Sequence, residues 1–502
     1  MRIGCWGIAL LAAVGAMSGG WAQEPAMQTV GVELKGDTMV YRVVPVPSRR
    51  GPGMRGRAWS VEQKLFALSK CWMEVHRNYA YLDRFGVERW DSLYRALITP
   101  VMQTRDDLEF YRLLAGFYAS LGNSQTYVRT FRHFPLTSIG YEEGWALRLM
   151  DVGGHVVVSE VCKEKAAILP PGSEILSVNG QPVGERIAGL MPCIPASTER
   201  VRRRWAVRVL LYGPIGTSHE VEFRRPDGTE GSVRLVNPHY GAEPDVDACV
   251  ALPGCSGKEL NENFRLTWYP GDVAYLKIRS FEYRCGQPQA FCNAFPEIRT
   301  RARKLILDLR NNSSRGLDYV AAEIFSRLTR DTVLYGPVSR SRIYDAALAA
   351  RGYHEFDPEE LASDARARIA RQHYCSEAFS EPERETYRFP EDRDGRLVVP
   401  TVILVNDATG NAAETFVGWA SSQSHMSTVG VPTSGSAGKK VMYEVLPGLQ
   451  CAVCTEEVRL PDGREFVGCG ITPDVVVENT MQDVLSGRDA VLEKALEILN
   501  DK

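Results

Sequence analysis

The segment Thr401–Ala420 (TVILVNDATGNAAETFVGWA) has the residue order of a buried strand, a tight turn and the start of a helix. Many hydrolases hold a nucleophile at such a junction, because the helix dipole and free N–H groups stabilise developing negative charge. In this chain the junction holds Asn411, followed three positions later by Glu414. A side-chain amide is neither an ionisable nucleophile nor a base near neutral pH. Asn411 and Glu414 also suit a purely structural N-cap and capping box.

Three blocks of sequence must position this junction. Residues 58–135 carry apolar residues at helical spacing and predict a helical domain. Residues 138–240 read as short strands, and the order PPGSEIL, VNGQPV and a helix within them resembles a PDZ domain. Residues 264–500 alternate strands and helices, which predicts an α/β domain with mostly parallel strands. A polar, charged insertion at 338–399 is expected at its surface.

The N-terminus predicts export. Arg2 precedes the apolar run Ile8–Met17, and small residues follow it, so residues 1–22 are typical of a signal peptide cleaved near Ala22. The run is too short to span a bilayer, and we expect no membrane span in the mature chain. Residues 23–57 are expected to form strands and a linker before the helical domain. The formal net charge of −3 gives no reason to expect a nucleic-acid partner.

The chain has twelve cysteines, of which Cys5 lies in the predicted signal. Spacing suggests small disulfide loops that join Cys249 to Cys255 and Cys285 to Cys292. A hairpin around Pro461-Asp462-Gly463 would bring Cys454 close to Cys469, and a structural bridge is the preferred interpretation. The CxxC at 451–454 lacks a second Cys/His pair at zinc spacing, so we expect no metal site and no cofactor.

Five groups of motifs carry a resemblance over nearly all of the chain after the signal. They are VAYLKIRSF (273–281), LILDLRNN (305–312), ILVNDATGNAAETF (403–416), STVGVPTSG (427–435) and GITPDVVV with GRDAVLEKAL (470–477 and 487–496). With the block order, they resemble the tail-specific, or carboxyl-terminal processing, serine proteases, whose relatives include tricorn-like peptidases and the non-proteolytic retinoid-binding repeats. The resemblance implies a crotonase/ClpP-like α/β protease-family domain, with an N-terminal helical domain and a PDZ-like β-rich domain.

The resemblance also identifies the catalytic positions, and each holds an unexpected residue. The family's serine corresponds to Asn411. The base corresponds to Ser436 in the Ser/Lys branch and to Gln125 in the tricorn-like branch. Where the oxyanion loop has glycines, this chain has Ser313 and Ser314. A serine must lose its proton to a base in order to attack, so the resemblance implies a degenerate site.

Other residues near these positions could supply chemistry. Thr409 and Ser436 carry hydroxyls, and Lys439 and His133 are the nearest substitute bases. Each also has an ordinary interpretation: a Lys-Lys pair after glycine is usually solvated, and a lone histidine is usually structural. No residue is therefore assigned as catalytic.

We expect an exported member of this family that has lost proteolysis and binds extended peptides or protein C-termini. Its peptide site is expected to include Asn312, Gly410 and Asn411, near the carboxyl ends of strands where α/β domains bind ligands. Two alternatives stay open: a serine peptidase with a relocated nucleophile and base, and a carrier of apolar ligands.

Overall fold

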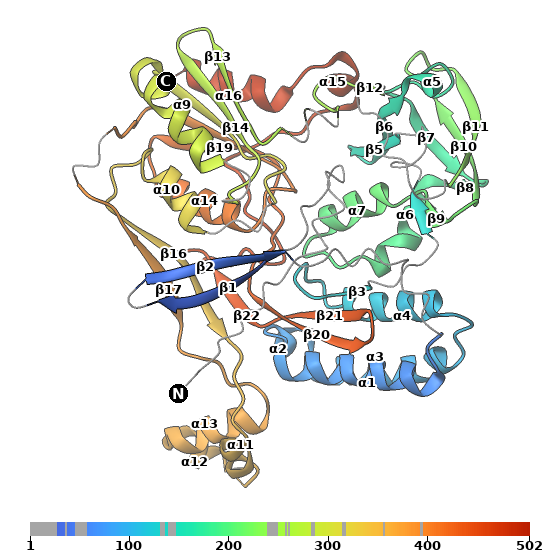
Figure 1. Ribbon diagram of the computed structural model, residues 1–502, viewed down its shortest axis with the longest axis vertical. Helices are drawn as coiled ribbons and strands as arrows, with labels where there is room; N and C mark the ends of the chain where they lie inside the picture. The colour runs from blue at the N-terminus through green and yellow to red at the C-terminus, as the bar shows by residue number, and fades with distance from the viewer. Residues whose placement is uncertain are drawn as a thin grey trace.

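The computed structural model describes residues 28–35, 38–45, 58–130, 136–138, 147–237, 249–256, 259, 262–282, 287–313, 318–354, 357–391 and 395–501. Figure 1 shows a helical block in blue, a β-rich block in green and a mixed α/β block in yellow to red. The predicted signal peptide lies outside the described residues. Ahead of the blocks, β1 (Gln28–Lys35) and β2 (Thr38–Pro45) pair as an antiparallel hairpin. No described helix is long and apolar enough to cross a bilayer.

The helical block begins where polar side chains cap the backbone. A capping box formed by Ser60 and Gln63 starts the first helix, and Asp106 accepts a hydrogen bond from the backbone of Glu109 at the start of the fourth. The rings of Trp90 and Phe117 stack at 3.8 Å in its core. The helices are α1 (Val61–Asn78), α2 (Leu82–Phe85), α3 (Val87–Met102) and α4 (Asp107–Ala119).

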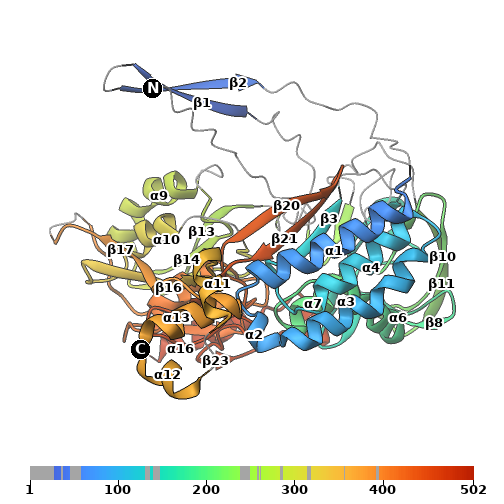
Figure 2. The ribbon, with the colours of Figure 1, turned by 90° about the horizontal axis from the view of Figure 1, so that it is seen from below.

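The core of this block is completed from far along the chain. Residues of β20 (Lys440–Leu446) and β21 (Leu449–Cys454) pack into the same buried cluster as the helices. In Figure 2 this hairpin lies beside α1. β3 (Tyr127–Thr130), which follows the helices, pairs antiparallel with β21. The helical block therefore shares one core with the C-terminal part of the chain.

The β-rich block is one sheet with three helices, α5, α6 and α7, against it. Its path is β11-β10-β7-β6-β12, with β5 paired to β6 and β8 paired to β7. Asn179 and Gly180 both have positive φ, at 54° and 73°, which is the turn that an Asn-Gly hairpin requires. The elements are β5 (Leu147–Val152), β6 (His155–Cys162), α5 (Lys163–Ala166), β7 (Glu174–Val178), β8 (Gln181–Pro182), α6 (Val183–Leu190), a 3₁₀ turn (Met191–Cys193), α7 (Glu199–Arg208), β10 (Ser218–Arg224), β11 (Glu230–Val236) and β12 (Cys249–Ala251). A separate pair joins β4 (Leu136–Ser138) to β9 (Tyr212–Pro214).

The α/β block is built on a six-stranded sheet in the order β13-β14-β15-β18-β19-β23. Its strands are β13 (Phe264–Tyr269), β14 (Val273–Ile278), β15 (Lys304–Asp308), β18 (Thr401–Val405), β19 (Met426–Gly430) and β23 (Val475–Val476). β13 runs antiparallel to β14, and all the other pairs are parallel. This agrees with the mostly parallel sheet expected from the alternating strand and helix patterns.

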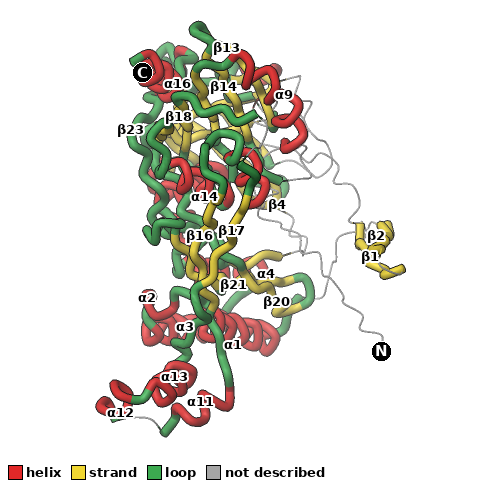
Figure 3. Tube along the Cα trace, turned by 90° about the vertical axis from the view of Figure 1, so that its left-hand side faces the viewer, coloured by secondary structure: helices red, strands yellow, loops and turns green. Residues whose placement is uncertain are grey.

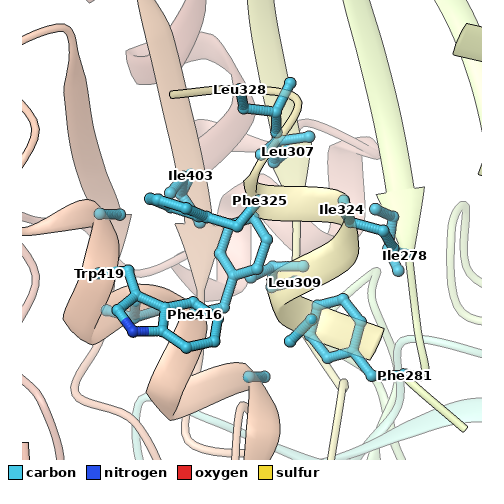
Figure 4. Close-up of a cluster of buried hydrophobic side chains, with 14 of the residues drawn as sticks. Ile278, Phe281, Leu307, Leu309, Ile324, Phe325, Leu328, Ile403, Phe416 and Trp419 are labelled. Carbon is cyan, nitrogen blue, oxygen red and sulfur yellow. The ribbon is translucent and has the colours of Figure 1, made fainter. Parts of the chain in front are cut away.

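Helices cover both faces of this sheet. On one face lie α9 (Gln287–Arg301), α10 (Asp318–Phe325) and α14 (Ala412–Ala420). Figure 4 shows this core, where the ring of Phe325 meets that of Phe416 edge-on at 4.9 Å. On the other face α16 (Ala490–Asn500) packs against alternate strand residues. A short helix, α15 (Met481–Ser486), precedes it.

The insertion combines a sheet with a small helical extension. β16 (Val333–Ser341) pairs with β17 (Glu383–Arg388) and β22 (Glu456–Arg459). Between them α11 (Ala346–Gly352), α12 (Pro358–Ser363) and α13 (Ala365–Tyr374) form a group set apart from the main body in Figure 3. The expected surface location of this charged segment agrees with the high exposure of its described side chains.

Candidate functional site

The turn between β18 and α14 is fixed by hydrogen bonds to the end of β15. Thr409 Oγ1 donates to the carbonyl of Leu309 at 3.0 Å and accepts from the backbone of Asn406 at 2.9 Å. The backbone N–H of Gly410 donates to the carbonyl of Asn312 at 2.9 Å. Thr409 is fully buried, so its hydroxyl holds the turn together and is closed to a substrate.

Asn411 has the backbone conformation of a strained turn. Its φ is 55° and its ψ is −124°, a combination that non-glycine residues rarely adopt. Strand-to-helix turns that present a nucleophile are strained in this way. The preceding Gly410 allows the close approach, because a Cβ there would lie 2.5 Å from Ser434 Oγ. The junction therefore has the backbone geometry of a turn that presents a nucleophile, although the residue at its tip is Asn411.

The Asn411 side chain belongs to a network of amides. Gln125 Nε2 donates to Asn411 Oδ1 at 3.3 Å and to Ser436 Oγ at 3.0 Å. Lys440 Nζ donates to Gln125 Oε1. Asn411 Nδ2 donates to the carbonyl of Ser313 at 3.3 Å. Gln125 thus stands between the Ser436 hydroxyl and Lys440, and an amide does not relay a proton as a base would.

Pairing between distant strands brings Gln125 to this site. The side chain of Asn123 accepts from the Gln125 backbone at 2.8 Å, which fixes the turn after α4. β3 begins two residues later and pairs with β21, in the same sheet as β20. Because Lys440 opens β20, this sheet sets both Gln125 and Lys440 beside Asn411.

Glu414 lies fully buried beneath the turn. Its carboxylate accepts hydrogen bonds from Thr433 Oγ1 at 2.6 Å and from the backbones of Gly435 at 2.7 Å, Ser436 at 3.2 Å and Asn411 at 3.2 Å. Burial raises the pKa of Glu414 to about 7, although each of these donors lowers it. The acceptance from the Asn411 backbone is one half of the capping box that the sequence predicts.

The remaining predicted site residues have other surroundings. Asn312 is buried, and its side-chain amide donates to the carbonyl of Ile278 at 3.0 Å, so it shapes the loop. Lys439 points outward, with Nζ 2.9 Å from Glu456. Its neighbour Lys440 is the lysine that reaches the site. His133 and Ser314 lie outside the described residues, and Ser313 is exposed beside Asn411.

Lys440 was not singled out by the sequence. The sequence indicated Lys439 as the lysine that could turn inward, and this was wrong because Lys439 is exposed and Lys440 reaches Gln125. Choosing between the two needs the starting residue of β20 and its register with β21. A strand that begins at Lys440 directs that residue toward Gln125 and leaves Lys439 before the strand. The sequence therefore showed a lysine pair near the site, and the register of β20 with β21 determined which lysine reaches Gln125.

The cysteine predictions were wrong where the structure tests them. Cys255, Cys454 and Cys469 are free thiols, so neither the Cys249–Cys255 nor the Cys454–Cys469 bridge forms. Cys454, the last residue of β21, is buried, whereas Cys469 is exposed, because the loop around Pro461 does not carry a hairpin as far as Cys469. Cys285 lies outside the described residues. Within the described ranges, no cluster of His, Cys, Asp and Glu side chains could hold a metal ion.

A cavity of about 740 Å³ lies between the β-rich block and the α/β block. Its walls come from β5, α7, the carboxyl ends of β15 and β18, and the residues after β23. Nine Arg or Lys and six Asp or Glu residues line it, which leaves an excess of positive charge. One wall is formed by Asn311 and Ser313, and the carbonyl of Ser313 is bonded to Asn411. The cavity therefore leads to the junction.

Comparison with known proteins agrees with this architecture. Residues 272–477 match the sequence model of peptidase family S41. A stretch of 103 residues is 29% identical to the carboxyl-terminal-processing protease of Synechocystis sp., covering 20% of this chain and 24% of that protein. This match thus spans about a quarter of that relative's length.

Solved structures extend the likeness to most of the chain. Mature CPAF complexed with lactacystin superposes with a TM-score of 0.66 at 16% identity, covering 88% of this chain and 99% of that chain. A second crystal structure of mature CPAF gives the same TM-score, and the match covers 98% of that chain. Identity at this level shows a shared fold. Taken together with the S41 match over residues 272–477, these results support the resemblance to the tail-specific proteases.

Proposed function

We propose that this protein is a pseudoprotease that binds extended peptides or protein C-termini. The observation that carries the proposal is the pairing of Gln125 Nε2 with Asn411 Oδ1 at 3.3 Å, where a protease of this fold needs a base and a serine. In the part of the chain that the structure describes, neither Thr409 nor Ser436 is hydrogen-bonded to a lysine or histidine. A relocated nucleophile would lack its base.

The cavity beside the junction supports peptide binding. β5 is an edge strand whose partner among the described strands is β6, and α7 packs along it. An extended peptide can add to such an edge through its main chain. A peptide that continues from β5 into the cavity would approach Ser313 and Asn411, and its carboxylate would meet an excess of positive charge.

The loss of proteolysis is tested with a fluorophosphonate probe. We expect no adduct on the folded wild-type protein in an intact-mass measurement, because no serine near the cavity, among the residues that the structure describes, is hydrogen-bonded to a lysine or histidine. Stoichiometric labelling would contradict the proposal. Labelling that disappears in Ser436→Ala would instead identify a peptidase with a relocated nucleophile.

Peptide binding is tested with two neighbouring arginines on α7. Arg204 lines the cavity and lies 3.3 Å from Asp407, whereas Arg203 lies outside it and is 2.8 Å from Asp151. The probe is a short fluorescein-labelled peptide that ends in apolar residues with a free carboxylate, measured by fluorescence anisotropy. We expect Arg204→Ala to weaken binding about tenfold, since hydrogen bonds to charged groups contribute about 1.5–3 kcal/mol.

Arg203→Ala is the matched control and should bind as wild type does. The amidated peptide should bind wild type more weakly and should be insensitive to Arg204→Ala. Equal weakening by both substitutions, or no binding by any form, would argue against a peptide site in this cavity. The charged lining also disfavours the apolar-ligand alternative, because an apolar ligand would leave those charges desolvated.

A further inference from the structure

The sheet of the insertion ends in an exposed strand, β17, whose outer main-chain edge is unused. The order of this sheet is β17-β16-β22, so β16 is the partner of β17 among the described strands. The side chains of β17 are exposed except for Tyr387, which is partly buried. β17 does not line the cavity, and Figures 1 and 2 show it on the side of the body away from the β-rich block. Such an edge can accept a further strand.

The hydrogen bonds of the sheet show which backbone groups of β17 point outward. The N–H of Phe389 donates to the carbonyl of Thr332 at 2.8 Å, so Phe389 faces β16. In an antiparallel pair the residues alternate between facing the partner strand and facing away. Tyr387 therefore also faces β16, and the N–H and C=O groups of Thr386 and Arg388 point away from it.

The alternation also turns Arg384 outward, on the far side of a bulge in the register. The N–H of Arg342 donates to the carbonyl of Thr455 at 3.1 Å, so the backbone of Val338, four residues earlier, faces β22. Arg384 lies opposite Val338 and therefore points away from β16. No backbone group in the described part of the chain bonds to this outer edge.

The side chains of the outward-facing residues share one face of β17, and two of them are unpaired cations. The guanidinium of Arg384 lies 4.1 Å from the ring centroid of Tyr335, which is on the same face. Among the described residues, no carboxylate forms an ion pair with Arg384 or Arg388. The arginines of the two neighbouring strands are neutralised, Arg340 by Glu457 and Arg459 by Glu465.

We propose that β17 docks an extended segment of another protein that carries acidic residues four positions apart. Residues four apart on a strand share a face and lie about 13 Å from each other, which is the spacing of Arg384 and Arg388. The segment adds as a strand, with main-chain bonds to the outer edge and one carboxylate opposite each arginine. Glu383 and Glu385 lie on the other face of β17, where the segment carries no acidic residue.

Charge on an edge strand also has a protective use, because it discourages pairing with apolar strands. Protection alone does not require the charges to be sorted by face. On β17 the cations lie on one face and the anions on the other. This sorting rejects apolar or basic chains and still accepts a strand of matching pattern. The proposal is independent of the peptide site proposed in the cavity.

The test uses the wild-type full chain and a fluorescein-labelled, amidated peptide, Thr-Val-Glu-Val-Thr-Val-Glu-Val-Thr. Its isomer Thr-Val-Glu-Val-Thr-Glu-Val-Val-Thr has the same composition but one glutamate on each face. We expect fluorescence anisotropy to show about tenfold tighter binding of the first peptide, since each exposed ion pair contributes a few-fold. Added salt should reduce the difference. Neither peptide has a free terminal carboxylate, so Arg204→Ala should leave binding unchanged.

Variants of β17 separate the contribution of the arginines from that of the backbone. The double variant Arg384→Ala with Arg388→Ala should bind both peptides equally weakly. Arg366→Ala, at an exposed arginine of α13, is the matched control and should bind as wild type does. Thr386→Pro removes an outward N–H and should weaken both peptides, whereas Thr386→Ala keeps it and should not. The arginine variants leave the backbone unaltered, so the test stands even where the proline variant fails to fold.

Three results would overturn the proposal. The first is equal binding of the two peptides by wild type, or binding that survives the loss of both arginines. The second is no binding by wild type at millimolar peptide, which would leave a purely protective role for the charged edge. The third is a single-stranded oligonucleotide that binds more tightly than the peptide and displaces it, which would assign the surface to nucleic acid.

Discussion

The junction at Asn411 and the cavity beside it differ in the side chains that they present. At the junction, the side-chain amide of Gln125 donates to that of Asn411, at the positions that the resemblance assigns to a base and a nucleophile. The cavity has an edge strand, a helix along it and an excess of positive charge. Hydrolysis depends on a few ionisable atoms, whereas binding is spread over many contacts. A few side-chain substitutions can therefore remove catalysis and leave a binding surface intact.

The backbone at the junction, unlike its side chains, has the features of a turn that presents a nucleophile. The turn retains a positive φ at Asn411, a glycine packed against Ser434 and a buried Glu414. These features are part of the packing between β15, β18 and α14, so the proposed loss of catalysis would leave them in place. If this is correct, restoring the two side chains should restore part of the chemistry.

The largest effect is expected from the double variant Gln125→His with Asn411→Ser. It places a base and a hydroxyl where Gln125 Nε2 and Asn411 Oδ1 now meet. We expect hydrolysis of an unstructured protein substrate to rise on the order of 10²–10⁴-fold above wild type, the range of a positioned general base. The measurement is release of fluorescent peptides from labelled casein.

Each single variant serves as the control and should remain at the wild-type level, because neither half of the pair acts alone. A well-folded double variant without any gain would show that the altered loop at Ser313 is also needed, and would weaken the view that the rest of the site is intact.

A smaller effect is expected on stability when Glu414 is removed. Glu414→Ala leaves the donors from Thr433, Gly435 and Ser436 buried without an acceptor. We expect a loss of about 3–5 kcal/mol in the free energy of unfolding, measured by urea denaturation. Glu465→Ala, at an exposed ion pair with Arg84, should cost less than about 1 kcal/mol. Similar losses for both would contradict a special role for the buried carboxylate.

The same carboxylate predicts a pH dependence. Its pKa is about 7 in the folded protein and near the ordinary value of 4.5 when unfolded, so between these values the folded state binds more protons. The contribution of Glu414 to stability is therefore largest below pH 4.5 and is lost as the pH rises through 7. At about 1.4 kcal/mol per pKa unit, this amounts to about 3 kcal/mol.

The check is urea denaturation of wild type and Glu414→Gln at several pH values across this window. The difference in unfolding free energy between the two proteins should change with pH in the stated direction. Parallel pH profiles would indicate that Glu414 does not titrate there.

The smallest effect concerns strain at Asn411. Asn411→Gly and Asn411→Ala both remove the bonds to Gln125 and Ser313, but only glycine relaxes a φ of 55° with a ψ of −124°. We expect the glycine variant to be more stable than the alanine variant by about 1–2 kcal/mol in thermal or urea unfolding. An alanine variant of equal or higher stability would show that the turn is not strained.

Much of the fold could be predicted from local patterns. The apolar run before Asn406 forms β18, the run that ends at Asp308 forms β15, and the Asn179-Gly180 turn has the expected backbone. These features depend on residues adjacent in sequence. The surroundings of Cys249 could not be predicted in the same way, since proximity in sequence suggested Cys255 as its neighbour, whereas strand register sets it opposite Cys162.

The sequence by itself determined the family resemblance, the junction and the residue types at its key positions, because strand and helix periodicity and turn chemistry are local. The tertiary structure decided which side chains meet. Gln125, Asn411, Ser436 and Lys440 converge only because β3 pairs with β21 and the α/β turn packs against that sheet. Such pairings join segments hundreds of residues apart, and their register depends on the packing of the whole core.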